Sequence, residues 1–162
     1  MKRLLIGLAF MALFFGMASV AMADYYRIRD DVTGGDCSLI GIWDLATKTC
    51  TLTIDLTDSI SIENDGITVD GNGHSLISSN HYWDVGIYIP HKKNVTVKNC
   101  TIKQFWSAFF VYYSTNSNIF GNIMVNNYYG LYLFASPTFN LEVQQMRLQG
   151  ASCSPDIFWA LC

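Results

Sequence analysis

The sequence predicts an all-β protein built as a parallel β-helix, a solenoid of about four rungs. Short apolar segments recur about every 22 residues in the second half of the chain. Within them apolar and polar residues alternate, which is typical of half-buried strands. A short repeat that holds several strands favours a coil over an array of hairpins. Only 14% of the 162 residues are charged and 14% are aromatic, which excludes a disordered chain.

Residues 1–23 have the pattern of a secretory signal peptide. Lys2 and Arg3 precede an apolar run, and Ala21–Ala23 ends this run as an A-x-A cleavage site. The alternative is an uncleaved anchor, because the run is just long enough to span a bilayer. We expect cleavage before Asp24, and therefore a secreted, periplasmic or cell-surface protein without a stable membrane span.

Residues 24–59 are expected to form an N-terminal cap region. Cys37 and Cys50 bracket a short segment whose polar centre can turn. Because an exported protein meets an oxidising compartment, a disulfide-closed hairpin is the economical interpretation, with two reduced core thiols as the alternative. This bond should stabilise the fold by about 3 kcal/mol. No cysteine has the close spacing of zinc ligands, and the pairing of the other three stays open: Cys100, Cys153 and Cys162.

Residues 60–150 carry the repeats of the predicted β-helix. One series of segments begins at Gly86, Ala108 and Gly130, which are evenly spaced. A second series begins at Asn94, Asn118 and Asn140, where the first interval is slightly longer than the second. Equivalent residues should stack from rung to rung at the ordinary strand spacing of about 4.8 Å.

Asparagines punctuate these repeats and can stack in the turns of a β-helix. Asn99 and Asn122 lie close to one repeat apart. We expect them to form a ladder that passes amide hydrogen bonds between rungs. The alternative is that both are simple turn residues, since asparagine tolerates left-handed backbone geometry.

The string DGITVDGNGHSLIS, followed by GIYIPHKKNVTVKNCTI, resembles the right-handed parallel β-helix proteins of the pectate-lyase-like superfamily. The nearest resemblance is to the NosD-like group of exported repeat proteins. It covers about residues 34–150, implies a right-handed coil, and says little about activity. Members of that group usually have many more rungs, whereas the tail at residues 151–162 matches none. The tail is either a C-terminal cap or the mark of a truncated relative of a longer protein.

Sugar-cleaving chemistry requires paired carboxyl groups, and residues 85–150 contain a single acidic residue, Glu142. We therefore expect no catalytic residue and lean against an enzyme. A polysaccharide lyase or hydrolase is the alternative, with an acidic or calcium-binding cluster in the first rungs. The same acids also fit ordinary turns: Glu63, Asp65, Asp70 and Asp84.

The NosD-like resemblance brings an association with copper. The histidines are His74, His81 and His91, whose spacings match no compact ligand motif. We expect neither a bound metal nor another cofactor.

Aromatic residues are dense in the predicted rungs, and sugar rings stack on such side chains. Residues 24–84 hold eleven acidic and three basic residues, whereas residues 85–150 hold one acidic and five basic residues. Lys92 and Lys93, with two further lysines, could therefore bind acidic groups of a polymer. Packing within the strands is the alternative role of the rings. The expected contact residues are Trp83, Tyr88, Trp106, Tyr113, Lys98 and Lys103.

The formal net charge of the chain is -3, and it has no basic stripe of the kind that nucleic-acid binding needs. The sequence therefore predicts an exported, non-catalytic β-helix module that binds polysaccharide or another component of the cell envelope. The competing interpretations are a carbohydrate-active enzyme and a remnant of a longer β-helix protein.

Overall fold

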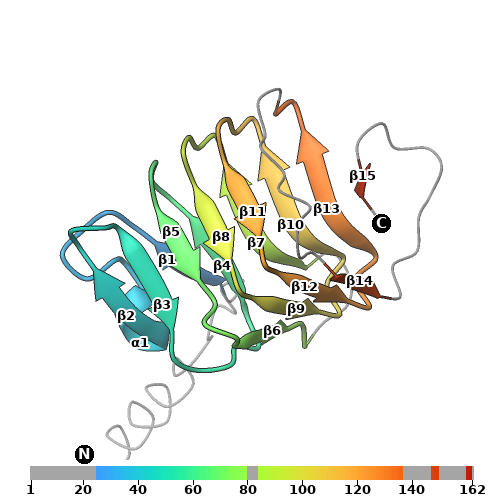
Figure 1. Cartoon of the computed structure of the whole chain (residues 1–162), viewed down its shortest axis with the longest axis horizontal. Coiled ribbons are helices and arrows are strands. Elements are labelled where there is room, and N and C mark those ends of the chain that lie inside the picture. Colours follow the sequence, from blue (N-terminus) through green and yellow to red (C-terminus); the bar gives the residue numbers. More distant parts are fainter. Residues whose placement is uncertain (1–24, 80–83, 137–146, 150–159, 162) are drawn as a thin grey trace, which may run out of the picture.

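The computed structural model of the chain describes residues 25–79, 84–136, 147–149 and 160–161. Parallel strands wind into a solenoid of about four turns, and three sheets, A, B and C, run along its length (Figure 1). The coil is right-handed (Figure 1), as crossover connections between parallel strands almost always are. The predicted right-handed parallel β-helix is confirmed.

From β4 to β12, each turn of the solenoid contributes one strand to each sheet. Sheet A contains β1 (Tyr25–Ile28), β4 (Ser59–Ile62), β7 (Val85–Pro90), β10 (Ser107–Tyr112), β13 (Tyr129–Phe134) and β15 (Ala160–Leu161). Sheet B contains β2 (Gly41–Asp44), β3 (Thr49–Leu52), β5 (Thr68–Asp70), β8 (Thr96–Lys98) and β11 (Asn118–Phe120). Sheet C contains β6 (Ser75–Ile77), β9 (Thr101–Lys103), β12 (Ile123–Val125) and β14 (Arg147–Gln149).

The strand register confirms the even repeat that the first series of segments predicted. In sheet A, Phe109 lies opposite Ile87 on one side and Leu131 on the other. In sheet B, Asn118 lies opposite Thr96 and not opposite Asn94. The second series was therefore wrong in treating Asn94 and Asn118 as equivalent positions of the repeat. The error arose because asparagine stands both at a corner and at the start of β11.

The core is a set of columns of inward-pointing side chains, one column under each sheet. Ile87 and Phe109 in sheet A, Val97 in sheet B and Ile102 in sheet C are fully buried. Alternate residues of a strand point to opposite faces, so stacking the rungs in register places apolar residue on apolar residue. Full burial of each such side chain contributes about 1.5–3 kcal/mol.

The N-terminal end differs from the repeats, because β2 and β3 form an antiparallel hairpin. The short helix α1 (Cys37–Ile40) precedes this hairpin, and a disulfide joins Cys37 to Cys50 in β3. The predicted disulfide is confirmed. Residues 59 and 60, where the expected cap region meets the expected repeats, both lie in β4.

The expected signal peptide, residues 1–23, lies outside the described residues, as does most of the expected tail, residues 151–162. In the part of the chain that the structure describes, no helix has the length and apolar character needed to cross a membrane.

Candidate functional site

The outward side of sheet A carries a continuous group of aromatic rings. Tyr88, Phe110 and Tyr132 occupy equivalent positions in β7, β10 and β13. Their ring centroids are 5.4 and 5.2 Å apart along the solenoid. Because parallel strands in register place equivalent side chains one rung apart, an outward aromatic position that recurs in every repeat becomes a row of rings.

A second row lies beside the first, toward the end of each strand. Tyr112 and Phe134 stack with ring centroids 5.3 Å apart. Tyr113 contacts both of them. Trp106, which directly precedes β10, contacts Tyr132 of the first row, with ring centroids 5.6 Å apart. Centroid separations of this size are those of favourable aromatic pairs. We call this group the aromatic face; it consists of Tyr88, Trp106, Phe110, Tyr112, Tyr113, Tyr132 and Phe134.

The aromatic face is partly open to solvent. Tyr113 is 48% exposed and Phe134 is 43% exposed, while Tyr88, Phe110 and Tyr132 are half-buried. Burial, followed by the nearby charges of Tyr112 and Glu63, raises the pKa of Tyr88 above its ordinary value. This shift favours the protonated hydroxyl, which can donate a hydrogen bond.

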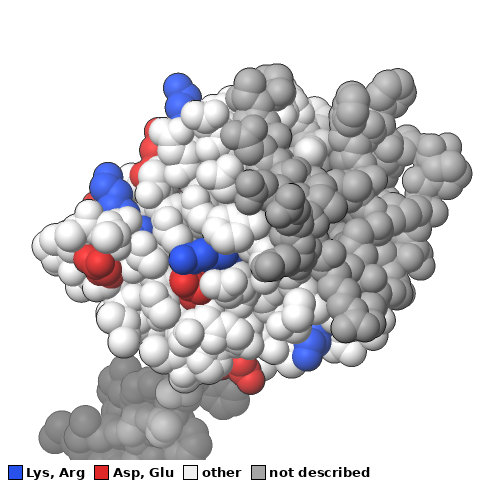
Figure 2. Space-filling model, viewed as in Figure 1, with Lys and Arg blue, Asp and Glu red and all other residues white. Residues whose placement is uncertain are grey.

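The structure brings together three of the predicted contact residues, Tyr88, Trp106 and Tyr113, on the aromatic face. It does not bring the two lysines there. Lys98 ends β8 in sheet B, and Lys103 ends β9 in sheet C. Trp83 lies outside the described residues. Sheet B is seen from outside in Figure 2, where charged side chains are few and lie singly or in small groups.

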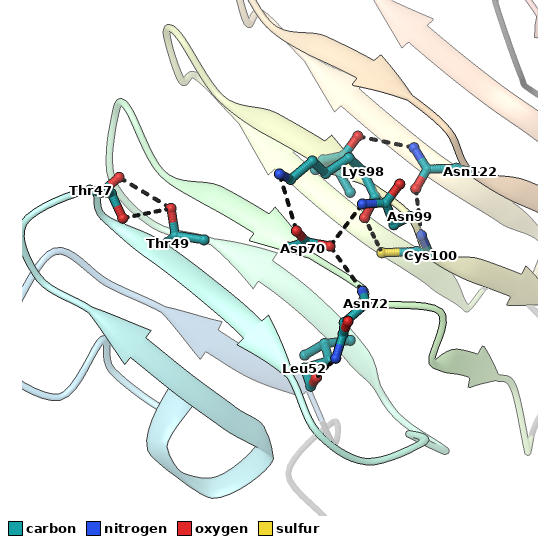
Figure 3. Close-up of polar contacts among 10 residues, drawn as sticks. Thr47, Thr49, Leu52, Asp70, Asn72, Lys98, Asn99, Cys100 and Asn122 are labelled. Atoms are coloured by element: carbon teal, nitrogen blue, oxygen red, sulfur yellow. Dashed lines mark hydrogen bonds and ion pairs between the residues drawn. The ribbon is translucent and has the colours of Figure 1, made fainter.

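Asp70, at the end of β5, is held by its neighbours (Figure 3). Its carboxylate lies 3.1 Å from the Lys98 ammonium, and it accepts hydrogen bonds from the Asn99 side-chain amide and from the Asn72 backbone N–H. Burial alone would raise the pKa of Asp70, but these bonds outweigh burial and hold the pKa below its ordinary value. This carboxylate therefore joins two rungs.

Each of the other predicted acids accepts a hydrogen bond from a different residue. Glu63 accepts a hydrogen bond from the Ser61 hydroxyl, and Asp65 accepts one from the Lys93 backbone N–H. Asp84 accepts one from the Ser78 hydroxyl. No three His, Cys, Asp or Glu residues in the described ranges are grouped so that they could hold a metal ion.

The asparagines link rungs, although not as one column. Asn122 is fully buried; its side-chain oxygen accepts from the Cys100 backbone N–H and its amide donates to the Val97 carbonyl. Asn99 lies one position out of register with Asn122 and donates to Asp70 instead. Asn127, which the sequence analysis did not single out, repeats the geometry of Asn122 between Phe105 N–H and the Ile102 carbonyl.

Several members of the aromatic face were missed as contact residues, among them Phe110 and Phe134. The signal that identifies Phe110 is in the sequence, since Tyr88, Phe110 and Tyr132 are evenly spaced at the period of the repeat. The set as a whole offers a broad surface of stacked rings with tyrosine hydroxyls among them. Such a surface can bind a flat or weakly polar partner.

The family model described as periplasmic copper-binding protein (NosD) matches residues 40–152. No curated protein and no solved structure matches the chain. The matched residues include all of sheet C and all of the repeats from β5 to β13. Match and architecture agree, and the chain belongs to the NosD family of exported, periplasmic β-helix proteins.

Proposed function

We propose that this protein is a non-catalytic β-helix module that binds polysaccharide of the cell envelope through the aromatic face. The observation that carries the proposal is the register of Tyr88, Phe110 and Tyr132, which lines up three outward rings along the solenoid. A linear polymer presents similar units at regular intervals. A row of similar rings can contact several of these units at once.

The chemistry of the face favours a sugar over a purely apolar partner. Tyrosine and tryptophan combine a large apolar ring with a polar group that needs a hydrogen-bond partner. A pyranose has the complementary form, with an apolar ring face and hydroxyls around it. The strands β4, β7, β10 and β13 contain no charged residue, so stacking and neutral hydrogen bonds would dominate over the sheet itself.

The placement of the acids supports binding without cleavage. Glycoside hydrolysis requires two carboxyl groups about 5–9.5 Å apart around the scissile bond. The strands of sheet A from β4 to β13 contain no acidic residue, and Glu63 and Asp84 adjoin opposite ends of these strands, directly after β4 and directly before β7. Asp70 lies on sheet B and is occupied by Lys98, Asn99 and Asn72.

Copper appears in the description of the family, but the described residues do not fit a copper site. His74 contacts Asp55 at 3.1 Å, whereas His91 lies among tyrosine rings. Copper in proteins is held by several imidazole, thiolate or thioether ligands together, and no such group of three His, Cys, Asp or Glu occurs in the described ranges. We therefore assign no copper chemistry to these residues.

The proposal is tested by affinity electrophoresis of the exported protein through gels that contain envelope polysaccharides. Retardation by at least one polysaccharide is expected, and Tyr88→Ala and Tyr113→Ala should each reduce it several-fold. Ile42→Ala is the matched control, because Ile42 is 66% exposed but lies on β2, away from the aromatic face. Thermal unfolding of each variant separates lost binding from lost fold.

Absence of retardation by every polysaccharide in the panel would contradict the proposal. Release of reducing or unsaturated sugar ends, measured with and without calcium and abolished by Asp70→Asn, would contradict the non-catalytic assignment. That second result would favour the carbohydrate-active enzyme instead.

A further inference from the structure

The corner that follows sheet A holds bulky residues in an unfavourable backbone conformation. His91 and Tyr113 occupy equivalent positions, one residue beyond β7 and β10, with φ of 51° and 48°. Bulky L-residues rarely adopt this region, because the Cβ atom then lies too close to the following carbonyl oxygen. The next left-handed position along the same turn has the residues that this geometry favours, Gly66, Asn94 and Asn116.

The strained residues place two rings face to face. The rings of His91 and Tyr113 are parallel within 2°, with centroids 5.4 Å apart. Tyr112 meets both rings edge-on, so the pair continues the aromatic face around the corner. Both residues are exposed, and glycine, which has no Cβ atom, would relieve the strain at either position. Ala135, the equivalent residue after β13, has φ of 47°, so this left-handed position recurs along the solenoid, and in two rungs it carries a ring.

Two lysines, Lys92 and Lys93, follow His91 directly in the chain. The backbone at Lys92 and Lys93 is held in place, because the Lys92 N–H donates to the Ser114 hydroxyl and the Lys93 N–H donates to Asp65. The ion pairs between described residues use Lys48, His74 and Lys98, and none of them uses Lys92 or Lys93. Within the described residues, these two ammonium groups are therefore available for an anion.

We propose that this corner binds the acid groups of an anionic polysaccharide, with carboxylates on Lys92 and Lys93 and a sugar ring against His91 and Tyr113. The inference rests on the proposed function and names the ligand class and the part of the surface that selects it. It also replaces the lysines expected from the sequence. Lys98 is paired with Asp70, and Lys103 lies on another sheet.

Asp65 provides a second test of the same idea. It contacts this corner through its hydrogen bond from the Lys93 N–H. An asparagine at position 65 can keep that bond through its side-chain oxygen while removing the negative charge. Asp65→Asn should therefore strengthen the binding of an anionic polymer, by about twofold, since a single exposed charge contributes little.

The experiment compares polygalacturonate with the same polymer after methyl esterification of its carboxyl groups, titrated into the exported protein by calorimetry. The acidic polymer is expected to bind more tightly, with an advantage that falls as salt is added. Lys92→Gln combined with Lys93→Gln should weaken binding of the acidic polymer roughly five- to tenfold. The same double variant should bind the esterified polymer as tightly as the native protein does. Lys103→Gln is the matched control and should change neither.

Equal binding of both polymers, unchanged in the double variant, would overturn this inference and leave the proposed function standing. If the acidic polymer binds better but Lys103→Gln weakens it as much as the double variant does, the anion site is not at this corner. Failure of native protein to bind either polymer, or any polysaccharide in the electrophoresis panel, would overturn the proposed function as well.

Discussion

Single buried amides determine how one rung attaches to the next. Asn122 and Asn127 flank β12, and each one satisfies a backbone N–H and a carbonyl of the preceding rung. A corner of the chain cannot use the regular ladder of a sheet, so its backbone groups need other partners. A buried asparagine supplies both a donor and an acceptor in one side chain.

Asn122→Ala should lower the free energy of unfolding by about 2–4 kcal/mol. The change leaves the Cys100 N–H and the Val97 carbonyl without the amide, and a buried unsatisfied group costs about 1–3 kcal/mol. Urea denaturation followed by tryptophan fluorescence measures the effect. Asn126→Gly is the control, because Asn126 is exposed with φ of 54°, which glycine tolerates. Similar losses in both variants would contradict this account.

Cys100 should be inert toward thiol reagents in the folded protein. Its side chain is buried and is not in a disulfide, and burial, followed by the charge of Asp70, raises the pKa of its thiol to about 12. Thiolate is the reactive form, so iodoacetamide at pH 8 should label this position only after unfolding. Peptide mapping before and after urea gives the result. Rapid labelling of Cys100 in native protein would show that the rung opens easily.

At the scale of the elements, the β2–β3 hairpin differs from every repeat because it is antiparallel and tied by a disulfide. A solenoid has open ends that must be covered. The hairpin and α1 lie at the N-terminal end of the coil (Figure 1). A covalent bond there limits the freedom of the unfolded chain and so favours the capped state.

Replacing both Cys37 and Cys50 by serine should reduce the free energy of unfolding by about 3 kcal/mol, the chain-entropy value for a loop of this size. Chemical denaturation of the variant and of the oxidised protein gives the difference. Reduction of the native protein with dithiothreitol should produce a comparable loss. An unchanged midpoint after reduction would show that the cap is held by packing alone.

The pairing of β5 with β8 should make stability depend on pH through Asp70. Its folded-state pKa is depressed, so its stabilising effect is complete above the ordinary aspartate value of about 3.9 and is lost as pH falls through the lower folded-state pKa. Asp70→Asn should be less stable than native protein near pH 7, and the difference should shrink toward pH 2. Denaturation at a series of pH values tests this. A difference that grows on acidification would have the wrong sign.

For the whole molecule, the register shared by the repeats makes one turn a removable unit. Deleting residues 107–128 joins Trp106 to Tyr129, which are the neighbours that an intact repeat requires. The shortened protein should fold with β-rich circular dichroism and a lower melting temperature. Deleting residues 107–127 instead shifts the strand by one position and reverses the faces of its side chains, so this control should aggregate. Equal behaviour of the two deletions would contradict the repeat model.

The features predictable from the sequence were those that repeat or lie close together along the chain. The even spacing of the segments at Gly86, Ala108 and Gly130 predicted the register of sheet A, and two cysteines around a polar turn predicted the disulfide. The sequence did not reveal that Lys98 and Lys103 lie on other sheets than the aromatic face. Both lie in rungs beside the aromatic face, but the two strands that carry them belong to other sheets.

The sequence by itself determined the coil, since alternating apolar patterns that recur at an even period bury their inward side chains best when stacked in register. It also determined the aromatic rows, because equal spacing becomes equal position in a solenoid. Only the tertiary structure decided which lysine pairs with a carboxylate, which asparagine is buried and which groups the acidic residues bind. Those outcomes depend on the side of the coil that each corner faces, where one residue more or less in a turn reverses the face to which the side chains point.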